Sequence, residues 1–85
     1  MFRVEWSPKA EAELFAAWQS TANRFSLLAS VQAAGAALSL QPLAVGESRD
    51  DDTLRVCFFH PVTIYFAVSP EENLVRIVHC VALAD

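Results

Sequence analysis

The sequence predicts an α+β fold in which a helical hairpin packs on one face of an antiparallel sheet, with the element order β-α-α-β-β-β. Two patterns in the 85 residues predict it. Apolar side chains recur at helical spacing through residues 8–40, whereas residues 2–6 alternate and the stretches after residue 53 are rich in β-branched and aromatic residues. The length suffices for one domain over residues 1–85, built on one core.

A first strand and a helix start are predicted at the N-terminus. Residues 2–6 alternate apolar with polar side chains, which is typical of a strand with one buried face. The side chains expected in the core are Phe2, Val4 and Trp6. Ser7 is suited to cap the next helix and Pro8 to begin it, because proline has no N–H to leave unpaired in a first turn.

Two helices are expected, from about Pro8 to Ser20 and from about Arg24 to Leu40, the second capped by Asn23. Each has one apolar face, made of Ala10, Leu14, Ala17 and Trp18 in the first helix and of Leu27, Val31, Ala34 and Leu38 in the second. Four polar residues lie largely away from the first face: Lys9, Glu11, Glu13 and Gln19. The many alanines of the second helix predict that it packs closely against the first helix and the sheet.

Three further strands are expected after a loop over residues 43–53, which also has room for a short edge strand around residues 45–47. They span residues 54–59, 62–68 and 74–83, and the short turns between them make a meander. The loop contains Asp50, Asp51 and Asp52. Because these carboxylates lack the alternation and the glycine of a calcium loop, we expect a solvated turn there, and neither a metal nor a cofactor.

Charge and apolar content narrow the class of protein. Six Lys/Arg against ten Asp/Glu give a net charge of −4, which repels nucleic-acid phosphates at long range and leaves only a local basic patch to bind them. No apolar run approaches the roughly 20 residues of a membrane helix, so we expect a soluble, cytoplasmic protein without membrane contact. Cys57 and Cys80 are expected to be buried thiols on adjacent strands.

Several short strings follow one another along nearly the whole chain. They are Val4-Glu5-Trp6-Ser7-Pro8-Lys9-Ala10 with Glu13-Leu14, a helix end at Leu38 and Pro42, Gly46-Glu47-Ser48-Arg49, and Leu54-Arg55-Val56. In this order and spacing they resemble the RelE/ParE superfamily of toxins. The resemblance implies a curved sheet and a bacterial type II toxin, neutralised by an antitoxin protein whose peptide wraps the toxin and often extends its sheet.

The two branches of the superfamily imply different targets and different residues. RelE-like members cut messenger RNA on the ribosome, whereas ParE-like members poison DNA gyrase. Cleavage requires cations on the concave sheet face and a tyrosine or histidine that transfers protons. By the resemblance, the catalytic candidates are Arg55, His79 and Tyr65, and the binding candidates are Arg49 and Arg76.

This sequence departs from the cleaving members at two places. Residues 62–68 contain no arginine where those members commonly carry one, and residues 82–85 lack the basic and aromatic residues with which many relatives continue. Both departures favour a ParE-like toxin that acts by binding a target such as DNA gyrase. A RelE-like ribosome-dependent nuclease with substituted catalytic residues, and a non-toxic interaction module of the same fold, are the alternatives.

Each candidate site residue also has a purely structural interpretation. His79 fits a partly buried histidine bonded to backbone, and Tyr65 fits a core residue with its hydroxyl at the edge. Arg55 and Arg76 fit solvated strand residues that pair with carboxylates. The apolar content of 54% predicts that an antitoxin, or a second copy in a homodimer, covers part of the surface.

Overall fold

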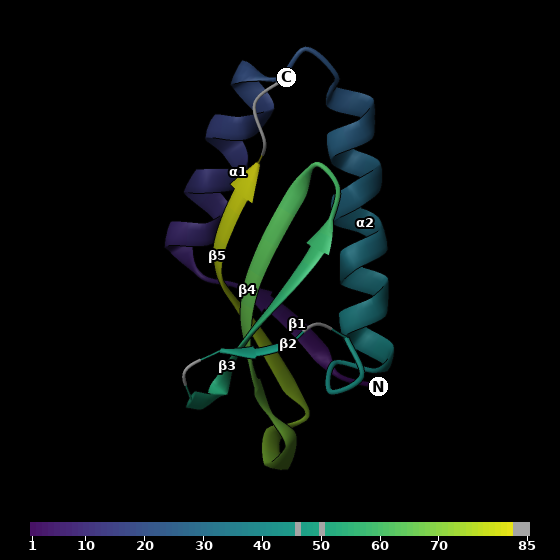
Figure 1. Cartoon of the computed structure of the whole chain (residues 1–85), viewed down its shortest axis with the longest axis vertical. Coiled ribbons are helices and arrows are strands. Elements are labelled where there is room, and N and C mark those ends of the chain that lie inside the picture. Colours follow the sequence, from purple (N-terminus) through teal and green to yellow (C-terminus); the bar gives the residue numbers. More distant parts are fainter. Residues whose placement is uncertain (46, 50, 83–85) are drawn as a thin grey trace.

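The structure, a computed structural model, describes residues 1–45, 47–49 and 51–82; for 47–49 and 51–53 it describes the backbone alone. The elements, in order, are β1 (Arg3–Trp6), α1 (Pro8–Ser20), α2 (Arg24–Leu40), β2 (Glu47–Arg49), β3 (Asp51–Phe59), β4 (Val62–Ser69), a 3-10 turn (Pro70–Glu72) and β5 (Leu74–Ala82) (Figure 1). None of the helices in this part of the chain combines the length and the apolar character needed to cross a membrane.

Side-chain caps fix the start of both helices where the sequence predicts it. The Ser7 hydroxyl accepts the Ala10 N–H at 3.1 Å, and the Asn23 side chain accepts the Ser26 N–H at 3.0 Å. Each cap gives a partner to one of the N–H groups that a first turn leaves unpaired. The predicted helix bounds are therefore confirmed.

The strands form one five-stranded sheet in the order β1-β5-β4-β3-β2. The meander β3-β4-β5 is antiparallel, as expected, and β2 adds a short strand at its edge close to the expected position. The pair β1–β5 is parallel, so the sheet as a whole is mixed. The residues of the predicted solvated turn differ from expectation, because Asp51 and Asp52 belong to β3; Asp50 lies outside the described residues.

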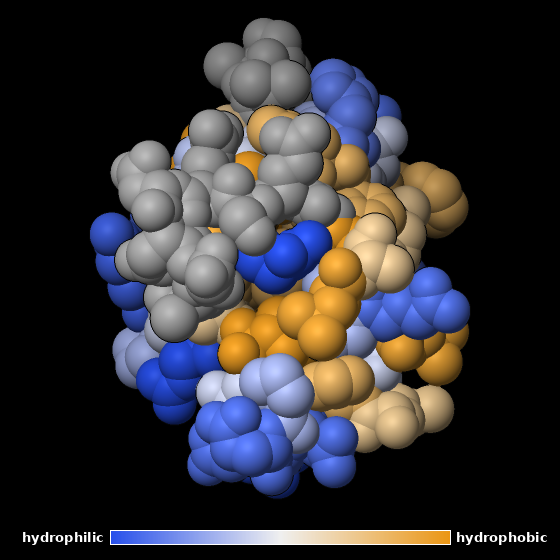
Figure 2. Space-filling view, turned by 60° about the horizontal axis from the view of Figure 1, so that its bottom comes forward, coloured by the Kyte–Doolittle hydropathy of each residue, from blue (hydrophilic) through white to orange (hydrophobic). Residues whose placement is uncertain are grey.

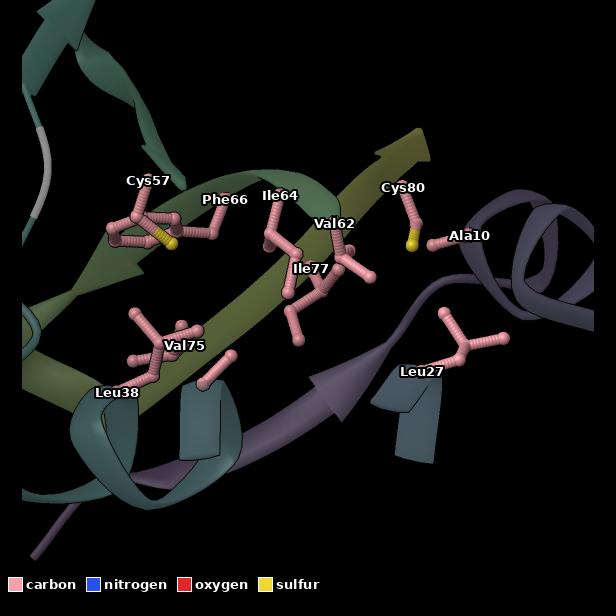
Figure 3. Packing of buried hydrophobic residues seen from close by; sticks show 11 residues of the cluster. Ala10, Leu27, Leu38, Cys57, Val62, Ile64, Phe66, Val75, Ile77 and Cys80 are labelled. Atoms are coloured by element: carbon pink, nitrogen blue, oxygen red, sulfur yellow. The ribbon is translucent and has the colours of Figure 1, made fainter. Parts of the chain in front are cut away.

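The core lies between one face of the sheet and the two helices. α1 packs against β5, and α2 crosses β1, β3 and β4. The buried cluster contains Ala10, Leu27, Ala34, Leu38, Cys57, Val62, Ile64, Phe66, Val75, Ile77 and Cys80 (Figure 3). The predicted core residues of β1 pack against this cluster, and the buried stripe of α2 is confirmed.

The two helices diverge instead of packing closely along their length. In Figure 1 they run beside different parts of the sheet and meet only near the loop that joins them. Trp18, expected on the buried face of α1, is consequently 36% exposed. The expected packing of α2 against the sheet is confirmed at Ala34, but the expected close packing against α1 was wrong. Ala33 and Ala36 face solvent, and only a few residues of α2 face α1.

The two cysteines are buried, as expected, but they are not on adjacent strands. Cys57 of β3 and Cys80 of β5 both pair with Ile64, which lies on β4 between them. Burial raises the pKa of each thiol to about 11, and the charge of Glu13 acts in the same direction on Cys80. Neither thiol is therefore a ready nucleophile at neutral pH.

A bulge in β5 decides which side chains face away from the helices. Phe66 pairs with Ile77, but the neighbouring Tyr65 pairs with His79, so Val78 is an extra residue. Side chains alternate between the two faces of a strand, and one inserted residue reverses that alternation. Cys80 therefore faces the core, whereas His79 joins Tyr65 on the opposite face, which we call the open face.

The packing predicts that two phenylalanines of the same meander respond very differently to substitution. Phe66 is 0% exposed, whereas Phe58 is 67% exposed. Phe66→Leu removes packed volume and should lower the free energy of unfolding by about 1–2 kcal/mol, while Phe58→Leu should change it by less than about 0.5 kcal/mol. Urea unfolding of both variants measures the difference, and equal losses would contradict this core.

Candidate functional site

The open face carries the only cluster of titratable side chains that the described residues form around a histidine. His79 of β5 and Tyr65 of β4 are paired across the sheet, and their ring centroids lie 5.3 Å apart with a tilt of 43°. Two of the three predicted catalytic residues therefore meet on one surface.

Glu13 of α1 is the third member of this cluster. Its two carboxylate oxygens lie 2.8 Å and 2.6 Å from Nδ1 of His79. The oxygen at 2.8 Å also accepts the backbone N–H of Cys80 at 3.0 Å. The side chains of His79 and Glu13 are 35% and 25% exposed, so the pair is shielded but reachable from solvent.

The path of the chain places Glu13 at this edge of the sheet. β1 ends at Trp6, which pairs with Ile77, so the rest of β5 has no strand on that side. Ser7 continues the coverage, because its N–H donates to the carbonyl of Ile77 at 2.9 Å and its hydroxyl to the carbonyl of Val78 at 3.4 Å. α1 then runs beside the uncovered part of β5, where the Glu13 carboxylate accepts the backbone N–H of Cys80.

The surroundings of Glu13 favour its charged form. Burial acts to raise the pKa of the carboxyl, but the hydrogen bonds from Cys80 and His79, with the charges of His79 and Lys9, outweigh burial and lower it. Glu13 is therefore a carboxylate at neutral pH. A carboxylate only accepts hydrogen bonds, so Nδ1 of His79 must carry the hydrogen between them.

Arg55, the third predicted catalytic residue, lies on the other side of the sheet. It pairs with the buried Phe66, and its guanidinium donates to the carbonyls of Leu43 at 3.2 Å and Val45 at 3.4 Å. Arg55 thus ties the loop after α2 to β3, and the structure does not bring it together with His79.

The two predicted binding residues have different outcomes. Arg76 is exposed on the open face, where its guanidinium lies 3.9 Å from the Glu5 carboxylate; Glu5 also pairs with Arg3 at 3.1 Å. The backbone of Arg49 belongs to β2, and its side chain lies outside the described part of the structure. Among the described residues no group of His, Cys, Asp or Glu could hold a metal ion.

Sequence reasoning missed Glu13 as a site residue and placed it largely away from the apolar face of α1. A weak signal was present, because position 13 lies one helical turn from Ala10, which is 0% exposed. A carboxylate at that spacing flanks the buried face of the helix. Its partner could not be found from the sequence, because the bulge at Val78 determines where His79 lies.

A second surface feature lies between the two helices. A groove of ≈ 630 Å³ is lined by Glu11, Ala12, Leu14, Phe15, Trp18, Leu27, Leu28 and Val31. Within it Phe15 is 61% exposed and Leu28 45% exposed. Arg24 lies 5.9 Å from the Trp18 ring, so a cation flanks one of its aromatic walls.

Comparison with known proteins shows what this architecture resembles. No family model and no curated protein matches the sequence. A chain of the toxin–antitoxin complex RelBE2 from Mycobacterium tuberculosis matches with a TM-score of 0.80 and 22% identity, over 99% of this chain and 93% of that chain. The chromosomal ParDE toxin–antitoxin system from P. aeruginosa matches with a TM-score of 0.64 and 21% identity, over 98% of this chain and 97% of that chain. The chain has the RelE/ParE fold.

The expected fold class is thereby confirmed over almost the entire chain. In this chain both helices lie on one face of the mixed sheet. Identity of 22% or less supports the fold, and the activity has to be inferred from the site itself.

The lowered pKa of Glu13 predicts how stability changes in acid. A group whose pKa is lower in the folded state stabilises the fold above its unfolded pKa, and this contribution is lost as the pH falls through the folded value. The Glu13→Gln side chain has no titratable group, but its amide oxygen can still accept the Cys80 N–H. Urea unfolding from about pH 7 to about pH 3 should show a stability advantage of wild type over Glu13→Gln that shrinks with falling pH. A constant difference would contradict the assignment.

The contacts of Arg55 predict a structural role. Arg55→Ala leaves two carbonyls of the 43–45 loop without these donors, and it should lower the free energy of unfolding by about 1–3 kcal/mol. Arg76→Ala, which removes only an exposed pair, should change it by less than about 0.5 kcal/mol. Thermal or urea unfolding of both variants measures these changes. An Arg55→Ala variant as stable as wild type would contradict the structural role.

Proposed function

We propose that this chain is the toxin of a bacterial toxin–antitoxin pair, that it acts by binding a cellular target in the ParE-like manner, and that an antitoxin neutralises it. DNA gyrase is the target to test first. The observation that carries the proposal is the exposed aromatic groove between α1 and α2, on a fold whose solved counterparts come from toxin–antitoxin systems.

The groove has the chemistry of a docking site for an amphipathic helix. Its walls are apolar side chains of two helices, and its rim carries one anion, Glu11, with the cation Arg24 beside Trp18. Exposed aromatic residues at the centre of a patch, within a polar rim, are the usual anchors of protein interfaces. A partner helix with apolar residues at i, i+3, i+4 and i+7 would cover Phe15 and Leu28.

Further apolar surface lies outside this groove. Figure 2 shows an apolar area in the middle of the face that it draws, with polar side chains below it. Leu40 and Leu43, near the end of α2, are 64% and 57% exposed. An antitoxin that wraps around the chain, as the resemblance implies, would cover several such areas at once, and a homodimer would cover fewer.

The electrostatics of the described residues favour binding over RNA cleavage. On the open face the arginines are Arg3 and Arg76, and Glu5 pairs with both of them. Arg55 is held on the helix side of the sheet. With a net charge of −4, this leaves little positive field to attract and hold a phosphate backbone.

One specific observation favours a second candidate, a RelE-like ribosome-dependent nuclease. The cluster of Glu13, His79 and Tyr65 is an arrangement that can transfer protons, and its two sheet residues lie on the open face. A histidine bonded to a carboxylate through Nδ1 is a common form of general base.

The proposal predicts growth arrest when the chain is produced alone in bacteria, and inhibition of gyrase supercoiling by the purified protein. Growth curves with Phe15→Ala and with the control Phe25→Ala, at matched soluble levels, accompany the supercoiling assay. Both phenylalanines are exposed, at 61% and 83%, but only Phe15 lines the groove, so loss of growth arrest and of gyrase inhibition should be confined to Phe15→Ala.

Three results would contradict this proposal in different ways. Normal growth with folded wild-type protein would exclude a toxin and leave a non-toxic interaction module. Arrest without gyrase inhibition would exclude the ParE-like target. Arrest with cleaved messenger RNA, abolished by His79→Asn in a folded protein, would replace the ParE-like proposal with the nuclease.

A further inference from the structure

We propose that Glu13 is a positioning residue for His79: by accepting the N–H of Nδ1, it turns Nε2 of His79 toward the open face as a proton acceptor for RNA. The inference rests on the second candidate function, the ribonuclease, and adds to it a residue from α1 that the sequence resemblance did not supply as part of the site.

The geometry fixes both partners of this hydrogen bond. Two carboxylate oxygens of Glu13 lie within 2.8 Å of Nδ1, and one of them is also held by the Cys80 N–H at 3.0 Å. The carboxylate is thus anchored to the sheet backbone rather than free to follow the ring. Tyr65, with its ring centroid 5.3 Å from that of His79, restricts the ring from the side of β4.

The hydrogen on Nδ1 decides the chemistry of the other ring nitrogen. A neutral imidazole carries one hydrogen, so Nε2 then holds a lone pair. Among the described residues nothing is hydrogen-bonded to Nε2. Nε2 is therefore left as an acceptor on a ring that is 35% exposed.

The substrate class that suits this acceptor is RNA with its 2′-hydroxyl. Nε2 takes the hydroxyl proton, the 2′-oxygen bonds to phosphorus, and the bond from phosphorus to the 5′-oxygen breaks. The leaving 5′-oxygen takes a proton from water, and a 2′,3′-cyclic phosphate remains. The imidazolium that forms is stabilised by the Glu13 carboxylate until it returns its proton to solvent.

The competing explanation is that Glu13 only covers the edge of β5 and does not position His79. The variant Glu13→Gln distinguishes these two roles. The amide oxygen of glutamine can still accept the Cys80 N–H, so the edge stays covered. The amide NH₂ group, however, replaces the oxygen that lies 2.6 Å from Nδ1, and by donating to Nδ1 it favours the tautomer with the hydrogen on Nε2. The substitution therefore keeps the cap and reverses the tautomer.

Long-range ¹H–¹⁵N correlation spectra of the imidazole nitrogens test this directly, at a pH at which both histidines are neutral. We expect the Nδ1–H form of His79 in wild type and the Nε2–H form in Glu13→Gln. His60, which is exposed and far from Glu13 in the sequence, should keep one spectrum in both proteins and serves as the internal control. The Nε2–H form of His79 in the wild-type protein would overturn the proposal.

Cleavage of messenger RNA on programmed ribosomes provides the second test. Glu13→Gln should lower the turnover by at least about 10-fold with an unchanged KM, and His79→Asn, which keeps a group for Glu13 to bind but lacks Nε2, should lower it by about 100-fold or more. If the wild-type protein cleaves the messenger and Glu13→Gln cleaves it equally fast, the role of Glu13 is overturned and the nuclease candidate stands. An intact messenger with wild-type protein would instead overturn the nuclease candidate and the proton transfer with it.

Discussion

The coverage of one strand edge sets the arrangement of the rest of the molecule. β1 covers one edge of β5 only as far as Ile77, and beyond it the backbone groups on that edge would be left without partners. Ser7 both caps α1 and bonds to this edge, so one residue fixes the start of the helix and its contact with the sheet. α1 is thereby held beside β5 and away from α2, which opens the groove and places Glu13 against the strand.

The bulge at Val78 complements that arrangement. Without the extra residue, His79 would follow Ile77 into the core, and Cys80 would face outward. With it, the thiol packs inside and the imidazole reaches the carboxylate at the edge. A single inserted residue therefore separates the apolar core from a polar cluster within one strand, and both proposed functions concern surfaces that this edge creates.

Local signals in the sequence were sufficient for the helices and the strands. The caps Ser7 and Asn23 and the apolar stripe of α2 depend on residues close in the chain, and they are confirmed. Three other features depend on strand register and on segments distant in the chain. They are the sheet face on which His79 lies, the contacts of Arg55 and the separation of the helices. Strict alternation along this strand would place His79 on the same face as Val75 and Ile77, because a bulge leaves no mark in the sequence pattern. The resemblance to toxins supplied Arg55 as a site residue, whereas its side chain binds a loop on the other face.

The central claim is that a side chain of α1, rather than a strand, covers the second half of β5. Native-state hydrogen exchange at the Cys80 amide tests it most directly, because that N–H has the Glu13 carboxylate as its partner. We expect this amide to be strongly protected in wild type and to exchange markedly faster in Glu13→Ala, while the Ile77 amide keeps its protection. Rapid exchange at Cys80 in wild type, or protection that survives the loss of the carboxylate, would contradict it.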